Sequence, residues 1–251
     1  MNRIPVVLVH GAWLHISSWQ GWTERLTAHG YDVHVPAWPL GDIGLDELAA
    51  HYEKAVRSLD TLPVVIGHSV GGLIARQLLD TGLARAAVAI APLPLPVLID
   101  QGAGHETSPE DYVTLPEAQF RRTIANTVGE HEAASLYHRY IVPAPHRLLA
   151  DLGFDGTTPG SFTDASVDTA GPEASTRGPL LLISGQEDRL VADAVTRAEY
   201  KRYGDSTSIT DLKQFADRGH SLVIDSGWPA VADYVLAWLA ANGMTTPAEA
   251  G

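Results

Sequence analysis

The amino-acid sequence predicts an α/β fold in which a mostly parallel sheet is flanked by helices on both faces. Short apolar runs alternate along the chain with segments of helical periodicity, which favours parallel strands joined by helices. The length of 251 residues suits one large α/β domain, or one with an insertion. The apolar runs cover residues 6–9, 33–35, 64–66, 86–91 and 180–184, with a weaker candidate at 209–215.

The segments between these runs predict helices with recognisable end signals. Gly30 and Gly82 follow the first and third of these segments, and glycine commonly ends a helix in this position. Asp46 and Glu47 open the second segment, where carboxylates suit the helix dipole, and Pro229 lies in the first turn of the last. The expected helices cover residues 17–29, 46–59, 69–81, 192–203 and 228–241.

Residues 92–178 interrupt this alternation, beginning with the extended segment Pro-Leu-Pro-Leu-Pro. Helical patterns within the stretch lie around residues 115–127, 129–140 and 145–153. We therefore expect an α/β core formed by residues 1–95 and 179–251, and a mobile helical cap formed by residues 96–178. The insertion leaves from the carboxyl end of a strand, so the cap should cover the edge where open α/β sheets bind ligands. An extra helical layer without contact to the chemistry is the alternative.

The composition excludes several kinds of chemistry. With 30 acidic and 17 basic residues, the formal net charge is −13, which argues against partners such as nucleic acids and anionic membranes. The chain has no cysteine, so disulfides, a thiolate nucleophile and Cys-bound zinc are excluded. Its 11 histidines lack the spacing of a metal site, and we expect neither a metal nor a cofactor. The sequence leaves the oligomeric state open.

The N-terminal segment does not resemble a secretory signal. Its apolar run at 6–9 is too short for the core of a signal peptide, and no cleavage site follows. No apolar stretch approaches the roughly 20 residues of a membrane-spanning helix. We therefore expect a soluble, cytoplasmic protein.

The most informative motif is Gly67-His-Ser-Val-Gly71, which matches the pattern G-x-S-x-G. It lies between the strand expected at 64–66 and a helical pattern, the context in which the central serine of a nucleophile elbow occupies a strained turn. Gly67 and Gly71 prevent collisions between neighbouring Cβ atoms there. Ser69 is thus the candidate nucleophile. We expect the side chain of His68 to pack beside Ser69 rather than to act as the base.

An activated serine requires a general base and a group that orients the base. His220 follows the last strand candidate and precedes the last helix, and Asp188 follows the strand expected at 180–184. The order Ser69, Asp188, His220 along the chain is that of a catalytic triad in this architecture. Glu187 is a rival for the acid, and a helix cap is the alternative role for Asp188.

The first expected strand ends in His10-Gly-Ala-Trp13, which places backbone N–H groups opposite the elbow. The N–H groups of Ala12 and Val70 are the expected oxyanion hole, since the residue after the nucleophile supplies one donor. We expect His10 to fix this loop through hydrogen bonds. Trp13 and His68 are candidates for contact with the substrate. For three other aromatic residues the sequence does not separate pocket lining from core packing: Trp19, Trp22 and Trp38.

Together these motifs resemble the α/β-hydrolase superfamily of serine esterases and lipases. The resemblance rests on His10-Gly-Ala-Trp13, Gly67-His-Ser-Val-Gly-Gly72, Gly185-Gln-Glu-Asp188 and Gly219-His220, and it covers residues 5–95 and 179–241. It implies the α/β-hydrolase fold, with about six strands because the first two strands of the family have no room before the strand at 6–9. The catalytic triad of the family falls on Ser69, Asp188 and His220, and its oxyanion donors fall on Ala12 and Val70.

The His-Gly-Ala-Trp start is most similar to plant methyl-ester esterases and hydroxynitrile lyases. The lyases of that group carry Thr where this chain has Gly11, and Lys directly after the catalytic His, where this chain has Ser221. Both differences favour ester hydrolysis.

We therefore expect a serine hydrolase that cleaves a small carboxylic ester, thioester or lactone through an acyl-enzyme. The same residues also suit C–C bond hydrolysis, a hydroxynitrile-lyase-type reaction or cofactor-free haloperoxidation. A non-catalytic receptor for small ligands is the alternative of another class.

Overall fold

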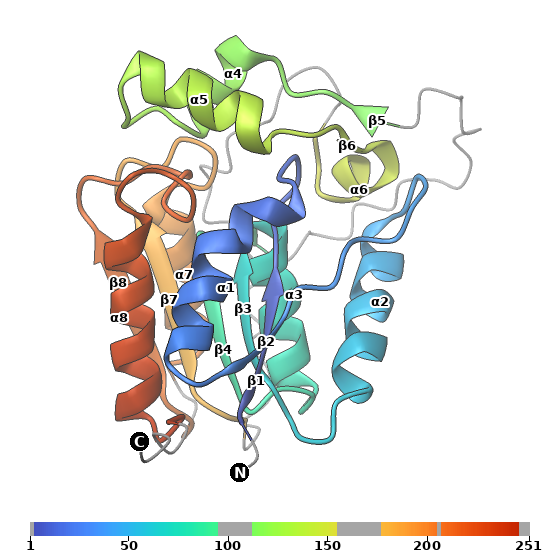
Figure 1. The fold of residues 1–251 in the computed structure, drawn as a ribbon, viewed down its shortest axis with the longest axis vertical. Coiled ribbons are helices and arrows are strands. Elements are labelled where there is room, and N and C mark those ends of the chain that lie inside the picture. Colours follow the sequence, from blue (N-terminus) through green and yellow to red (C-terminus); the bar gives the residue numbers. More distant parts are fainter. Residues whose placement is uncertain (1–2, 95–111, 155–176, 205–206, 246–251) are drawn as a thin grey trace.

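The computed structural model describes residues 3–94, 112–154, 177–204 and 207–245. Its centre is a six-stranded sheet in the order β2-β1-β3-β4-β7-β8, in which each pair of neighbouring strands is parallel (Figure 1). The strands are β1 (Pro5–Val9), β2 (Asp32–His34), β3 (Val64–His68), β4 (Ala86–Ile90), β7 (Leu180–Gly185) and β8 (Thr210–Phe215). The predicted fold class and number of strands are confirmed.

Helices cover both faces of this sheet. They are α1 (Gln20–Ala28), preceded by the 3₁₀ helix η1 (Ile16–Trp19), then α2 (Leu45–Arg57), α3 (Val70–Asp80), α7 (Asp193–Arg202) and α8 (Trp228–Ala241). In Figure 1, α1 and α8 lie together in front of the sheet, whereas α3 and α7 lie behind it, with α2 next to α3. None of the described helices has both the length and the apolar character needed to cross a membrane.

Four of the five predicted helices begin at a different residue from the one expected, and two of these differences have a clear local cause. The segment expected at 17–29 starts as a 3₁₀ turn, in which the His15 side chain accepts a hydrogen bond from the Ser17 N–H, and the α-helix begins only at Gln20. The helix expected at 69–81 begins at Val70, because the φ of 58° at Ser69 is far from helical values. Both differences come from local backbone geometry at the first turn.

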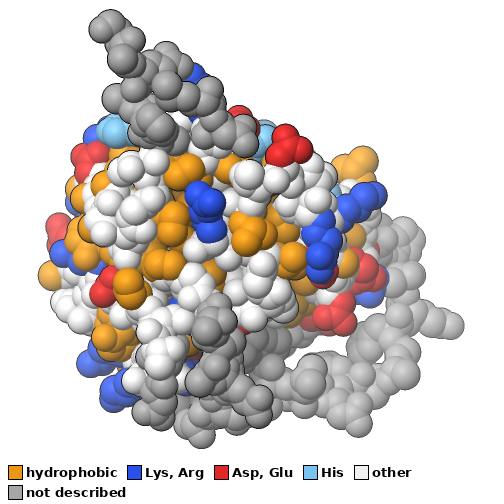
Figure 2. All heavy atoms as spheres, turned by 90° about the horizontal axis from the view of Figure 1, so that it is seen from below, with side chains coloured by type: hydrophobic (Ala, Val, Ile, Leu, Met, Phe, Trp, Pro, Cys, Tyr) orange, Lys and Arg blue, Asp and Glu red, His pale blue; other side chains and the backbone are white. Residues whose placement is uncertain are grey.

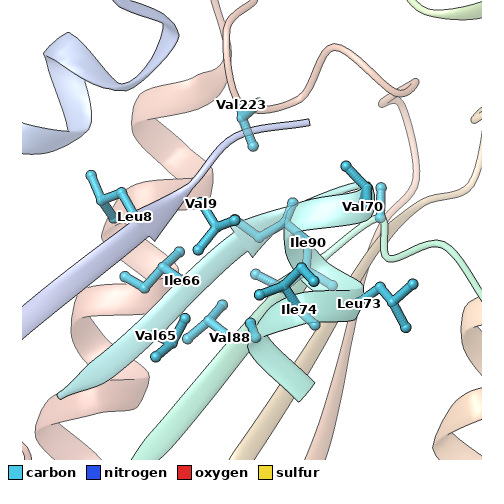
Figure 3. Packing of buried hydrophobic residues seen from close by; sticks show 14 of the residues in the cluster. Leu8, Val9, Val65, Ile66, Val70, Leu73, Ile74, Val88, Ile90 and Val223 are labelled. Carbon is cyan, nitrogen blue, oxygen red and sulfur yellow. The ribbon is translucent and has the colours of Figure 1, made fainter. Parts of the chain in front are cut away.

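The core lies where the central strands pack against the helices. A row of side chains crosses the sheet in register, from Leu8 through Ile66 and Val88 to Leu181, and all four residues are fully buried. Figure 3 shows the first three of them among their apolar neighbours. Burial on both faces explains why the central strands are continuously apolar.

A buried ion pair joins α3 to α7. The guanidinium of Arg76 contacts the carboxylate of Glu199, and neither side chain is more than 2% exposed. Arg76 also donates a hydrogen bond of 3.1 Å to the carbonyl oxygen of Leu93, just past β4. Separating the two side chains would leave an uncompensated buried charge, which is costly. The pair therefore opposes movement of α3 relative to α7.

A separate layer lies over the carboxyl ends of the strands (Figure 1). It consists of β5 (Tyr112–Val113), α4 (Glu117–Thr123), α5 (Glu130–Tyr140), β6 (Ala144–Pro145) and α6 (His146–Asp151), and we call these residues, 112–154, the upper layer. β5 and β6 form an antiparallel pair that was not predicted, because strands of two residues have no detectable periodicity. Residues 95–111 and 155–176, most of the rest of the expected cap, lie outside the described residues.

Hydrogen bonds attach the upper layer to the sheet layer at several separated places, and two of these lie near β1 and α2. The N–H of Val142 donates to the carbonyl oxygen of Trp13 at 2.9 Å, on the loop after β1. The carboxylate of Asp151 accepts the N–H of Leu45 at 2.7 Å and so satisfies a free donor in the first turn of α2.

On the opposite face of the molecule, at the amino ends of the strands, charged side chains of both signs are scattered among apolar ones (Figure 2).

We predict that Gly71→Ala strongly destabilises the protein. A Cβ at position 71 would overlap the carbonyl oxygen of Val9, a backbone atom that moves only if β1 moves. The free energy of unfolding, measured by urea denaturation, should fall by about 3 kcal/mol. Gly129→Ala is the matched control, because a Cβ at that position would have no neighbour within 4 Å, and it should cost less than about 1 kcal/mol. Equal unfolding midpoints would contradict the close approach of α3 to the sheet.

Candidate active site

Ser69 occupies a strained turn between β3 and α3. Its φ of 58° and ψ of −120° lie outside the helical and extended regions, and few non-glycine residues adopt positive φ. Hydrogen bonds hold the turn on both sides: the Ser69 N–H donates to Ile90 at 2.9 Å, and the Ser69 carbonyl oxygen accepts the N–H of Leu93 at 3.2 Å. Gly67 is required because a Cβ there would overlap the carbonyl of Gly71. The local geometry is therefore the expected strand, tight turn and helix.

Asp188 and His220 are brought together by the loops that follow β7 and β8. His220 Nδ1 lies 2.8 Å from Asp188 Oδ2, and both side chains are buried. The other carboxylate oxygen of Asp188 accepts the N–H groups of Leu190 and Val191, each at 2.8 Å. The carboxylate is thus fixed by three contacts and orients the imidazole. The rival, Glu187, has an exposed side chain.

The helix-cap alternative for Asp188 describes only part of what this residue does. The first residue of α7 is Asp193, and the residue before it, Ala192, occupies the N-cap position. The bonds from Leu190 and Val191 close a turn that precedes the helix. Asp188 therefore fixes its own loop and contacts His220 at the same time.

His68 links the elbow to the His220 loop. Its Nε2 lies 3.0 Å from the carbonyl oxygen of His220, and the two rings lie 4.6 Å apart between centroids. Since a carbonyl oxygen only accepts, Nε2 carries the proton and Nδ1 is unprotonated. Burial, reinforced by the neighbouring His220, holds the pKa of His68 well below its ordinary value. His68 is therefore neutral at neutral pH and packs against His220, while its contact with a substrate remains a prediction.

The loop after β1 completes the convergence. A Cβ placed on Gly11 would lie 3.0 Å from Ser69 Cβ and 3.0 Å from His68 Nδ1, so this loop passes directly over the elbow. Among the described residues, neither the Ala12 N–H nor the Val70 N–H donates to a protein acceptor. Val70 lies in the first turn of α3, where N–H groups have no partner within the helix. Both N–H groups thus lack a protein acceptor, and their role as an oxyanion hole remains a prediction.

His10 fixes the loop that carries Gly11 and Ala12. Its Nδ1 lies 3.1 Å from the Gly11 carbonyl oxygen, and its ring stacks on Trp38 with centroids 4.5 Å apart and planes 17° apart. The stacking on Trp38 was not predicted, because nothing in the sequence connects two residues on different loops. Of the three tryptophans left open, Trp38 contacts this loop, whereas Trp19 and Trp22 pack edge to face against each other in the core.

Trp13, a candidate for the acyl pocket, joins the β1 loop to the upper layer. Its backbone has φ 61°, a second strained position near Ser69. The indole N–H donates to the carbonyl oxygen of Val113 at 3.1 Å, and the ring meets Phe154 edge to face at 5.3 Å. Contact between Trp13 and a substrate remains a prediction.

Metal binding receives no support from the described part of the chain. In residues 3–94, 112–154, 177–204 and 207–245, no group of three or more His, Asp and Glu side chains is placed to hold a metal ion.

Residues 6–234 match the family model described as the alpha/beta hydrolase family. The chain belongs to the alpha/beta hydrolase family. The match runs from β1 into α8 and thus includes the elbow and both of the loops that carry Asp188 and His220.

Solved structures of other alpha/beta hydrolases share this fold at low sequence identity. The monoacylglycerol lipase of Paleococcus ferrophilus is 17% identical, with a TM-score of 0.69 over 95% of this chain and 94% of that one. Polyneuridine aldehyde esterase is 14% identical, with a TM-score of 0.63 over 94% of this chain and 99% of that one. The esterase Est2 of Thermogutta terrifontis is 15% identical, with a TM-score of 0.63 over 98% of this chain and 86% of that one. A search of curated proteins gave no significant match.

We predict that stability falls as the pH is lowered from about 6.5 to 4. Burial lowers the pKa of His10 from 6.5 to about 4, so between these values the unfolded chain binds a proton that the folded protein excludes. The stabilising contribution is complete above pH 6.5, and acidification to below pH 4 removes about 3 kcal/mol of it. Denaturant unfolding at several pH values measures this dependence.

Two variants test the assignment to His10. His10→Asn should reduce the slope of the pH dependence between 4 and 6.5, whatever its effect on stability at pH 8. The slope that remains is expected from His68, whose pKa is also lowered by burial. His131→Asn, at an exposed position of α5, should leave the dependence unchanged. An unaltered slope in His10→Asn would disprove the assignment.

Proposed function

We propose that this alpha/beta hydrolase is a serine hydrolase that cleaves small carboxylic esters, thioesters or lactones. The observation that carries the proposal is the 2.8 Å contact between His220 Nδ1 and Asp188. The His220 loop is joined to the strained Ser69 turn through its carbonyl oxygen, which lies 3.0 Å from Nε2 of the adjacent His68. A buried carboxylate, an imidazole and a serine in a strained turn form the standard apparatus for acyl transfer.

In the proposed reaction His220 is the general base. Because its Nδ1 faces Asp188, Nε2 is left to accept the proton of Ser69 Oγ as this oxygen attacks the substrate carbonyl. The imidazolium that forms is stabilised by Asp188 and then protonates the leaving alcohol or thiol. Water activated by His220 hydrolyses the acyl-enzyme and regenerates Ser69.

The N–H groups of Ala12 and Val70 are the proposed oxyanion donors. Donors of this kind each contribute roughly 3 kcal/mol to the stability of the transition state.

The neutral state of His68 also supports the role of His220 as the base. A positive charge on His68, whose ring lies 4.6 Å from that of His220, would oppose proton transfer to His220.

Residues 96–178 are proposed to cap this site, over a core of residues 1–95 and 179–251. The upper layer supports this, because it lies over the carboxyl ends of the strands and contacts Trp13 directly. A cap in this position would exclude water and shape the pocket for the acyl group.

Ester hydrolysis is favoured over a lyase reaction by positions 11 and 221. A side chain at position 11 would point toward Ser69 Cβ, and this chain has glycine there. Ser221 directs its hydroxyl to Asp225 Oδ2 at 2.9 Å, and so braces its own loop. Product analysis distinguishes ester hydrolysis from C–C bond hydrolysis, cyanohydrin cleavage and haloperoxidation.

We predict that Ser69→Ala lowers the turnover of p-nitrophenyl acetate by at least about a thousandfold, because it removes the attacking oxygen. Circular dichroism should be unchanged, since the side chain contributes little to packing. A fluorophosphonate probe should label the wild-type protein at Ser69 and leave this variant unlabelled. Ser58→Ala, at an exposed position after α2, is the control and should retain both activity and labelling. Wild-type turnover by Ser69→Ala would refute the mechanism, and a wild-type protein that binds esters without labelling or turnover would be a receptor.

A second variant tests the approach of the β1 loop to the elbow. Gly11→Ala adds a Cβ at 3.0 Å from both Ser69 Cβ and His68 Nδ1, so the loop that carries the Ala12 donor and the elbow must move apart slightly. We expect kcat for p-nitrophenyl acetate to fall roughly 10- to 100-fold, in the range seen when one oxyanion donor is misplaced. Gly129→Ala serves as the control for a methyl group added elsewhere. Equal kcat values for the two variants would contradict the assignment of the Ala12 N–H as an oxyanion donor.

A further inference from the structure

The turn that follows α4 contacts both of the loops that carry the proposed catalytic pair. This turn, Ile124 to Thr127, belongs to the upper layer and is far in sequence from Asp188 and His220. We call it the α4 turn. Three hydrogen bonds join it to the two loops, and each of them ends on a residue directly adjacent to Asp188 or His220.

Two of these bonds enclose His220 on the main chain. The N–H of Gly219 donates to Thr127 Oγ1 at 3.2 Å, and the N–H of Ser221 donates to the carbonyl oxygen of Ile124 at 3.0 Å. The residues before and after His220 in the chain are therefore both held by the α4 turn. Since the backbone on either side of His220 is fixed, the direction of its Cα–Cβ bond is fixed, and the contact with Asp188 then orients the ring.

The third bond reaches the loop that carries the carboxylate. Asn126 Nδ2 donates to the carbonyl oxygen of Glu187, the residue before Asp188, at 2.8 Å. Asn126 lies so close to the other loop that a Cβ on Gly219 would come within 2.6 Å of Asn126 Oδ1. The side chain thus fills the space between the two loops and contacts both of them.

We propose that Asn126 and Thr127 are positioning residues that set the alignment of Asp188 and His220, and that the upper layer thereby acts on the proton-transfer step. This inference rests on the proposed function, because it assigns the α4 turn to the same site. The two loops are also joined directly, by the Glu187 N–H that donates to the carbonyl oxygen of Arg218 at 3.0 Å and by the contact between His220 and Asp188. Loss of a turn contact should therefore loosen the pair without unfolding the loops.

Isosteric variants test this proposal. Thr127→Val keeps the shape but removes the acceptor for Gly219, whereas Thr127→Ser keeps the hydroxyl. Asn126→Asp keeps the shape but removes the donor to Glu187, with Asn126→Ala as its substitute if that variant does not fold. Ser135→Ala is the matched control, because its hydroxyl bonds only within α5, to His131, in the same layer.

We expect Asn126→Asp and Thr127→Val to lower kcat for p-nitrophenyl acetate roughly tenfold, with KM within twofold of wild type and unchanged circular dichroism. The downfield proton signal of the His220 Nδ1–H in ¹H NMR should broaden or disappear in both variants. Thr127→Ser and Ser135→Ala should match wild type in all three measurements.

The proposal is overturned if Asn126→Asp and Thr127→Val keep wild-type kcat and an unchanged proton signal. It is also overturned if Thr127→Ser loses as much as Thr127→Val, because the hydroxyl is then irrelevant, or if Ser135→Ala loses as much as both. Failure of the proposed function is distinguishable: the wild-type protein would show neither ester turnover nor labelling at Ser69, and the proton signal would still decide whether the α4 turn aligns the pair.

Discussion

The close approach of α3 to the ends of β1 and β3 is the constraint on which the site depends. Gly67 and Gly71 allow this approach, since a Cβ at either position would overlap a backbone carbonyl. With the helix so near, the connecting residue must take a positive φ, which costs Ser69 about 1–3 kcal/mol. Burial of α3 and hydrogen bonds to Ile90 and Leu93 offset this strain. The serine is held at the sheet edge because the surrounding packing leaves no other conformation.

Three further segments depend on that position. The loop with Gly11 lies over the elbow, His68 packs against His220, and Asp188 orients His220 from the far side. These groups are buried, so their electrostatic interactions are stronger than in water. Burial lowers the pKa of His68 and keeps this residue neutral, so it adds no positive charge beside the imidazole of His220.

The sequence predicted those parts of the structure that are encoded locally. The four central strands of the main sheet, β1, β3, β4 and β7, are buried and largely apolar runs. The elbow is set by glycines within five residues of Ser69. The contact between Asp188 and His220 was anticipated from their positions after successive strands. The stacking of His10 on Trp38 and the contacts of Asn126 and Thr127 were not, because they join side chains from distant segments that carry no shared pattern. The positive φ of Trp13 has no local signal either, since tryptophan does not favour that region.

The pairing of β4 with β7 has a consequence for how such proteins diversify. These strands are hydrogen-bonded neighbours although the connection from Ile90 to Leu180 spans roughly 90 residues. Loop-closure entropy grows only with the logarithm of length, so this connection costs about 2 kcal/mol more than a minimal crossover of a dozen residues. Lengthening or replacing this stretch should therefore change the free energy of folding only slightly. Evolution can exchange the covering of the sheet at this junction while the layers beneath continue to fold.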